Sequence, residues 1–316
     1  MTDQAILDWL LTGDVALQYL TCRELLGDER SDLRARIEHE GWGAQVLAAR
    51  NPDGSWGRGF YQPQWTCSHY TLLDLKTLGL PQDNRLARAS VHDIATAHRG
   101  ADGGINPPVS GATNRADVCI NGMFLNYASY FGQDQQLLCS VVDFLLGQQM
   151  PDGGFNCRKN RSGARHSSLH STISVLEGIT EYVLQGYGYR TDELGRVAAG
   201  AREFILQHRL YKSDRTGAVI HPELLKLSVP PRWKYNILRA LDHFRTAGVA
   251  WDERMRDAID ALLAKRRPDG RWTAQSAPPG QTHVVMEPAR APSRWNTLRA
   301  VCVLRTYNDS LTAAVS

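Results

Sequence analysis

Three residues that can bind a metal ion stand near the starts of two apolar segments. The stretch "RADVCING" (115–122) places Asp117 two residues before Cys119, where a polar loop changes to an apolar run, and His170 opens "HSTISVLEG". Residues two apart on a helix point about 200° from each other, so Asp117 and Cys119 converge on one ion only if the helix begins between them. A helix cap and a buried cysteine are the alternative interpretation of the pair.

Carboxylate, thiolate and imidazole are all zinc ligands, and a site with three protein ligands keeps a fourth position for water or substrate. We therefore expect Asp117, Cys119 and His170 to bind a catalytic Zn²⁺ ion. The Cys67–His69 pair is a candidate extension of this site, with His69 also a candidate base. Cys139 and Cys157 are expected to play no part in zinc binding.

The elements that would position these residues follow from a repeat. Four turns look alike, "NPDGSWG" (51–57), "GADGGIN" (100–106), "MPDGGFN" (150–156) and "RPDGRW" (267–272), and Asp-Gly is a strong turn signal. Their aspartates, at 53, 102, 152 and 269, are separated by 49, 50 and 117 residues, and "KSDRTGAV" (212–219) is a degenerate copy in the long gap. A period of about 50 residues indicates a repeat architecture.

Apolar residues at i, i+3 and i+4 predict a helix before each turn and a second helix after it. The second helices are expected at 68–80, 120–132, 171–184, 235–248 and 296–307, and no run of strands is evident. The predicted fold is all-α, an α/α barrel (toroid) of five to six helical hairpins around a central cavity, formed by one domain of residues 1–316. The Asp-Gly turns should lie at one end of it.

Aligning the second helices predicts a ring of equivalent positions at one mouth of the barrel. Trp65, Asp117, His170, Trp233 and Trp295 share one position, and two residues later come Cys67, Cys119, Thr172, Tyr235 and Thr297. The three tryptophans, with Tyr235, are expected to form an aromatic substrate wall, ordinary packing being the alternative. Arg232 and Arg294 are candidates for a phosphate or carboxylate clamp, the alternative being a solvated helix start.

The turn "QMPDGGF", its loop and its second helix resemble the α/α-toroid superfamily of protein prenyltransferase β subunits and squalene-type terpene cyclases, over nearly the whole chain. In the protein prenyltransferases an Asp-x-Cys pair and a His on the next inner helix hold the zinc, which implies Asp117, Cys119 and His170 here. The chain departs from that family at Gly111, Asn114 and Ile120, and Arg115 is the candidate replacement for the missing diphosphate-binding cations. It contains no Asp-x-Asp-Asp cyclase motif.

Composition limits the partners. The net charge of +3 among 316 residues argues against nucleic acid, and no apolar run reaches the length of a membrane span. Without an export signal the six cysteines are expected to be free thiols in the cytoplasm. A small-molecule substrate, an isoprenoid or a thiol, is expected, and no α-subunit-like partner is evident.

Three functions are therefore carried forward. The first is a zinc-dependent transferase of the prenyltransferase type, or a zinc hydrolase, that activates a thiol or water. The second is a metal-free relative of the terpene cyclases, and the third is a toroid that binds a lipid or a protein without catalysis.

Overall fold

The computed structural model describes residues 3–107, 116–275 and 279–313, with side chains at 160–161 and from 309 onward left aside. Two compact units divide the chain, and each is described by itself. Unit 1 comprises Met1–Ala44, Leu206–Pro279 and Val284–Ser316, and unit 2 comprises Gln45–Ile205 and Gly280–His283.

Unit 2 is built from helices that follow the repeat. Its helices are α4 (Gly41–Ala48, shared with unit 1), α5 (Ser68–Thr77), α6 (Arg85–Ala97), α7 (Val118–Tyr130), α8 (Gln135–Leu146), α9 (Lys159–Ser162), α10 (Leu169–Leu184) and α11 (Thr191–Gln207, reaching into unit 1). The expected second helices at 68–80, 120–132 and 171–184 correspond to α5, α7 and α10, to within a few residues at each end.

Unit 1 holds the remaining elements. They are α1 (Asp3–Leu11), α2 (Val15–Thr21), the π-helical turn η1 (Cys22–Leu26), α3 (Ser31–Arg36), η2 (Pro222–Leu225), α12 (Ile237–Thr246), η3 (Glu253–Met255), α13 (Arg256–Leu263), β1 (Trp272–Thr273), β2 (Pro292–Ser293) and α14 (Arg294–Ala313). The two short strands pair antiparallel, Trp272 with Ser293, and the sequence pattern does not predict them. The described residues are otherwise helices and loops, so the all-α prediction is confirmed.

The four Asp-Gly turns all form, and each has the same backbone. In every one the glycine has a φ between +79° and +88°, which only glycine adopts readily. The turn residue two before each aspartate also exchanges backbone hydrogen bonds across the turn, as in Met150 N–H to Gly154 C=O at 3.0 Å. The predicted turns are therefore confirmed. Their common position at one end of a barrel stays a prediction, since Asp269 belongs to unit 1 and the others to unit 2.

A second contact ties each turn to the helix that follows it. The first apolar residue after the turn donates its backbone N–H to a polar side chain of that helix. The donor–acceptor pairs are Trp56–Ser68 (2.9 Å), Ile105–Asn121 (2.6 Å), Phe155–Thr172 (3.0 Å) and Trp272–Thr297 (3.0 Å). We call these contacts the turn anchors. They fix where each second helix begins relative to the turn that precedes it.

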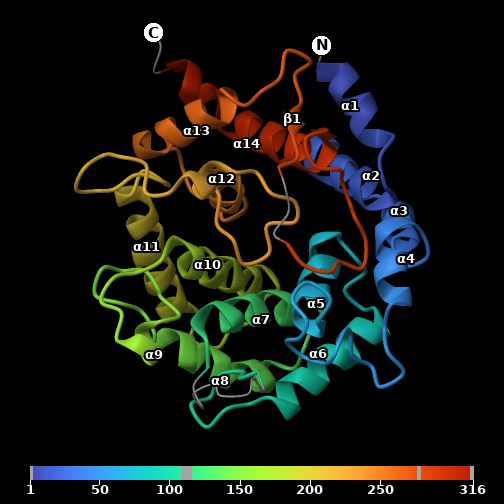
Figure 1. The fold of residues 1–316 in the computed structure, drawn as a ribbon, viewed down its shortest axis with the longest axis vertical. Helices are drawn as coiled ribbons and strands as arrows, with labels where there is room; N and C mark the ends of the chain where they lie inside the picture. Colours follow the sequence, from blue (N-terminus) through green and yellow to red (C-terminus); the bar gives the residue numbers. More distant parts are fainter. Residues whose placement is uncertain (1–2, 108–115, 276–278, 314–316) are drawn as a thin grey trace. The chain divides into compact units, whose positions relative to one another are not determined.

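Helices α7 and α10 pack along each other at unusually short range (Figure 1). A Cβ added at Gly122 would lie 2.6 Å from the Ser174 carbonyl oxygen, and one at Gly178 would lie 2.3 Å from the Gly122 carbonyl oxygen. Only glycine permits this approach, because any side chain would push the backbones apart. The close contact holds the starts of α7 and α10 side by side.

No helix in the described part of the chain is long and apolar enough to cross a membrane.

Candidate functional site

A pair of cysteine thiols lies where α7 and α10 begin. The Sγ atom of Cys157, which follows directly on the third turn segment, accepts a hydrogen bond from the backbone N–H of Cys119 at 3.1 Å. It also accepts one from the Ser171 hydroxyl at 3.2 Å, and Ser171 Oγ in turn accepts the Cys157 N–H at 3.2 Å. Both cysteine residues are half-buried.

These contacts change the pKa values of the two thiols in opposite directions. The Cys119 thiol donates to Cys157, and this bond, with that from Ser171, lowers the pKa of Cys157. The same bond raises the pKa of Cys119 well above its ordinary value, and burial and the nearby Asp117 charge add to the rise. Donors to a sulfur and the start of a helix both favour a thiolate. Cys157 is therefore the nucleophilic member of the pair.

Asp117 occupies the N-cap position of α7, but its side chain makes no capping hydrogen bond to the helix. The helix start is held instead by Asn121, whose side-chain amide donates to the Asp117 carbonyl at 2.9 Å. The carboxylate of the second turn also contributes, since Asp102 accepts the Ala116 N–H at 2.9 Å. Asp117 is half-buried and does not cap α7 through its side chain, so the simple helix-cap explanation is wrong.

Aromatic side chains from α5 and the loop before it adjoin this centre. The Tyr61 and Tyr70 hydroxyls lie 3.3 Å apart, and the Trp65 ring meets that of Tyr70 edge to face at 4.9 Å. Burial, followed by the Cys119 and Asp117 charges, raises the pKa of Tyr61. Tyr61 is half-buried and Tyr70 and Trp65 are buried. The electrostatic influence of Cys119 and Asp117 on Tyr61 puts the tyrosine pair and the thiol pair in one neighbourhood.

His69 is part of the wall behind the tyrosines. It is 0% exposed, its Nδ1 lies 3.1 Å from the Tyr127 hydroxyl, and its Nε2 has no hydrogen-bond partner. Burial lowers the pKa of His69 to about 3, so the ring is neutral. Cys67, at the N-cap of α5, is also buried, and burial raises its pKa to about 11. Both are packed in the interior of unit 2 rather than presented to solvent.

The three predicted zinc ligands belong to the described part of the chain, but they do not form a metal site there. In residues 3–107, 116–275 and 279–313, no three His, Cys, Asp or Glu side chains lie together so as to hold a metal ion. Asp117, Cys119 and His170 all belong to this part, so their present arrangement does not fit a three-ligand centre. The Cys119 thiol contacts Cys157 instead. Zinc binding stays a prediction, and it requires these side chains to regroup.

The predicted register between α7 and α10 is wrong by two residues. Asp102 accepts the Ala116 N–H and Asp152 accepts the Ser167 N–H, while the turn anchors match Asn121 with Thr172. Both contacts align Asp117 with Ser168, and Cys119 with His170. The sequence alignment pairs Asp117 with His170 instead. The loops before α7 and α10 differ in length, and this difference conceals the two-residue offset in an alignment of the sequence alone.

The other predicted substrate residues lie in unit 1, apart from Trp65. Trp233 is half-buried with the Lys234 ammonium 6.0 Å from its ring, and Trp295 is buried with its N–H bound to Glu287 at 3.0 Å. The buried Tyr235 donates its hydroxyl to Leu210 C=O at 2.6 Å. A ring that joins these residues to Trp65 stays a prediction.

The predicted arginine clamp has a separate outcome for each member. Arg294 donates to the Trp9 carbonyl at 3.0 Å and lies over the Trp9 ring, so its guanidinium binds helix α1. Arg232 is buried with a φ of +54°. Arg115 falls outside the described residues.

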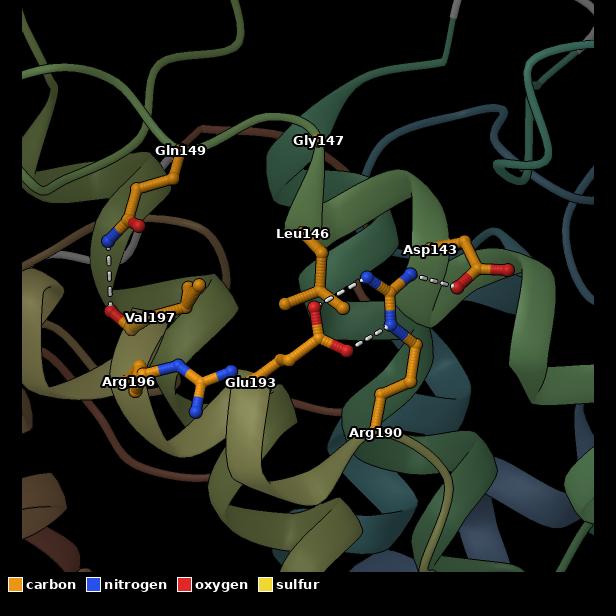
Figure 2. Close-up of a pocket in the computed structure, with 8 residues that line it drawn as sticks. All are labelled: Asp143, Leu146, Gly147, Gln149, Arg190, Glu193, Arg196 and Val197. Atoms are coloured by element: carbon orange, nitrogen blue, oxygen red, sulfur yellow. Dashed lines mark hydrogen bonds and ion pairs between the residues drawn. The ribbon is translucent and has the colours of Figure 1, made fainter.

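Figure 2 shows a different depression, between α8 and α11 on unit 2. Its charges pair among themselves, because Arg190 bridges Asp143 at 2.5 Å and Glu193 at 2.7 Å. Ion pairs of this exposed kind contribute little energy, and of the charged side chains drawn around the depression only Arg196 stands outside them. The depression is therefore a weaker candidate than the thiol and tyrosine centre.

Sequence reasoning missed Cys157, Ser171, Tyr61 and Tyr70. A signal for Cys157 was present, since it comes two residues after Phe155, which is anchored to α10. The tyrosines carried no comparable signal, because the helix and loop patterns around them say nothing about the thiols that they approach.

No known protein family matches the sequence, and no curated protein does. Among solved structures, the chain is similar to a glycosyl hydrolase of family 88 from Bacteroides vulgatus, with a TM-score of 0.52 and 13% identity over 96% of this chain and 91% of that one. A polysaccharide lyase matches with a TM-score of 0.44 and 12% identity, over 77% and 73% of the two chains. The first likeness confirms the predicted α/α toroid. The likeness to the glycosyl hydrolase does not reach the prenyltransferases, so that branch of the superfamily stays a prediction.

Proposed function

We propose that this chain is an enzyme that cleaves a C–O bond in a small organic substrate, by elimination or hydrolysis, with a carbohydrate as the class to test first. The observation that carries the proposal is the Tyr61–Tyr70 hydroxyl pair, 3.3 Å apart, together with the half-buried Asp117 at the start of α7, whose charge contributes to the raised pKa of Tyr61. The likeness of the fold to a glycosyl hydrolase over 96% of the chain supports the choice of substrate class.

The aromatic wall suits a sugar. Flat rings offer an apolar face to the C–H side of a pyranose, and tyrosine hydroxyls supply the polar contacts that orient it. The half-buried Tyr61, on the loop before α5, provides such a face, and the buried rings of Tyr70 and Trp65 pack behind it.

The chemistry needs one acid and one base. The Tyr61 hydroxyl, 3.3 Å from that of Tyr70, is protonated at neutral pH and is the candidate donor to the leaving oxygen; because burial raises its pKa, it donates only as negative charge develops on that oxygen. Asp117 would remove a proton from the substrate carbon next to the one that bears the leaving oxygen. The C–O bond would break as a C=C bond forms between these two carbons. Hydrolysis by the common two-carboxylate route would need a second carboxylate at the same centre. This requirement favours elimination.

The test is a panel of uronic-acid glycans and aryl glycosides with the purified chain. Elimination gives a new double bond seen by ultraviolet absorbance, whereas hydrolysis gives new reducing ends without it. On the best substrate, Asp117→Asn and Tyr61→Phe should each lower kcat by about 100-fold or more. Matched controls are Asp93→Asn, on the exposed face of α6, and Tyr189→Phe, a half-buried tyrosine whose hydroxyl donates to Asp143. Equal activity in Asp117→Asn and Asp93→Asn would remove Asp117 from the mechanism.

Zinc-dependent group transfer is the second candidate. It is favoured by the second thiol, since Cys157 lies against Cys119 and adds a soft donor that suits zinc, while a third ligand would have to move toward the pair. Metal analysis of the chain purified without chelator tests it. The candidate fails if Cys119→Ala and Cys157→Ala bind as much zinc as the unmodified chain.

A further inference from the structure

Cys119 and Cys157 are in direct contact although 38 residues separate them. The Cys157 Sγ lies 3.1 Å from the Cys119 amide nitrogen, which is itself two bonds from the Cys119 Cβ. A disulfide has an S–S bond of about 2.05 Å, so closure needs the Cys119 side chain to turn toward the Cys157 sulfur, which already lies against the Cys119 backbone.

The backbone around the pair is firmly held. The Gly122–Gly178 contact fixes α7 against α10, and the Phe155–Thr172 anchor fixes the turn that leads to Cys157. The Ser171 hydroxyl accepts the Cys157 backbone N–H and donates to the Cys157 sulfur. These contacts therefore hold the two cysteines next to each other in the folded chain.

Cys139 provides the internal comparison. It is half-buried like the pair, but its thiol donates to the Gln135 carbonyl of its own helix at 3.3 Å. It therefore matches Cys119 and Cys157 in exposure and differs in having a backbone carbonyl, rather than a second thiol, as its partner.

We propose that Cys119 and Cys157 form a reversible disulfide by exchange with a low-molecular-weight disulfide of the glutathione type. In the first step the Cys157 thiolate attacks one sulfur of that disulfide, forms a mixed disulfide and releases one thiolate. In the second, the Cys119 sulfur attacks the Cys157 sulfur, gives up its proton and releases the second thiolate. The two cysteines lose two electrons and two protons, and the small disulfide becomes two thiols.

The second step is intramolecular, so its effective concentration is on the order of mM or higher. It should be faster than attack by a free small thiol on the mixed disulfide, so the mixed disulfide should not accumulate. Oxidation would link the loop after the third turn to the first turn of α7, directly beside Asp117.

The experiment uses the full chain, treated with EDTA so that zinc plays no part. The chain is equilibrated with glutathione buffers of increasing oxidised fraction, quenched with acid, alkylated and cut with an endoproteinase that cleaves before aspartate. Asp134, Asp143 and Asp152 then separate Cys119, Cys139 and Cys157 into three peptides. We expect a peptide pair joined by Cys119 and Cys157, while Cys139 is alkylated or carries glutathione.

Three variants complete the test. Cys119→Ser should abolish the joined pair and trap glutathione on Cys157, Cys157→Ser should abolish the pair, and Cys139→Ser should leave the pair unchanged. The unmodified chain decides the question even if a variant fails to fold. Recovery of Cys119 and Cys157 in separate peptides at the highest oxidised fraction, each alkylated or glutathionylated, would overturn the proposal. This outcome is independent of whether any glycan is cleaved.

Discussion

The buried imidazole of His69 makes a quantitative prediction about acid stability. In the folded chain its pKa is lowered to about 3 by burial, whereas its ordinary value is 6.5. The unfolded chain therefore binds one more proton than the folded chain between these two values. Stability is fully present above about pH 6.5 and falls as the pH drops toward 3. Because His69 is 0% exposed, solvent does not screen the effect.

The size of the loss follows from the two pKa values. Between about pH 8 and pH 5 this one group should lower the free energy of unfolding by about 2 kcal/mol, nearly all of it below pH 6.5. The assay is urea unfolding at both pH values, for the unmodified chain and for His69→Phe. Other groups, such as the partly buried His98, titrate in both proteins and cancel in the difference.

The variant should lose about 2 kcal/mol less than the unmodified chain on going from about pH 8 to pH 5. Any constant cost of leaving the Tyr127 hydroxyl without His69 also cancels, because it is present at both pH values. Identical pH dependence in the two proteins would refute the reasoning, as would a His69 ring that titrates near pH 6.5 by NMR.

Two further predictions concern the frame of the site. Gly122→Ala should destabilise the chain by about 1–3 kcal/mol, because its Cβ would meet the Ser174 carbonyl at 2.6 Å, while Gly195→Ala on α11, where the Cβ meets nothing within 4 Å, should be neutral or stabilising in the same thermal melt. Asn121→Ala should cost about 2–3 kcal/mol in urea titrations, because it leaves the buried Ile105 N–H without its acceptor. Asn121→Asp should cost at least as much, because its second oxygen would face the Ile105 and Asp117 carbonyl oxygens to which the amide now donates, and a smaller loss than in Asn121→Ala would contradict this two-way role.

Much of the fold could be predicted because its signals are local. Pro-Asp-Gly sequences specify the turns, and apolar spacing specifies α5, α7 and α10 within a few residues of their observed ends. Glycine is favoured just after the end of a helix, and Gly79 and Gly132 both have a positive φ there. Each of these features depends on residues within a few positions of one another.

The site was harder because it depends on distant contacts. The Cys119–Cys157 pair exists because Gly122 and Gly178 bring two helices together, and no local pattern announces that packing. The alignment of Asp117 with His170 fails for a related reason, since the loops before α7 and α10 differ in length. A spacing argument assigns chemistry to residue types but not to the partner that each side chain meets.

The turn anchors have an implication for how this architecture diversifies. The donor and acceptor of each anchor are 12, 16, 17 and 25 residues apart in the four repeats, yet the same bond closes each time. The loop between the two ends of a turn anchor can therefore double in length while the helix that follows is held to its turn by the same hydrogen bond. Evolution can lengthen or replace these loops, including the one that carries Tyr61 and the one that carries Cys157, without moving the scaffold. An engineer who wishes to graft a new recognition segment should cut between the two ends of an anchor and leave both ends intact.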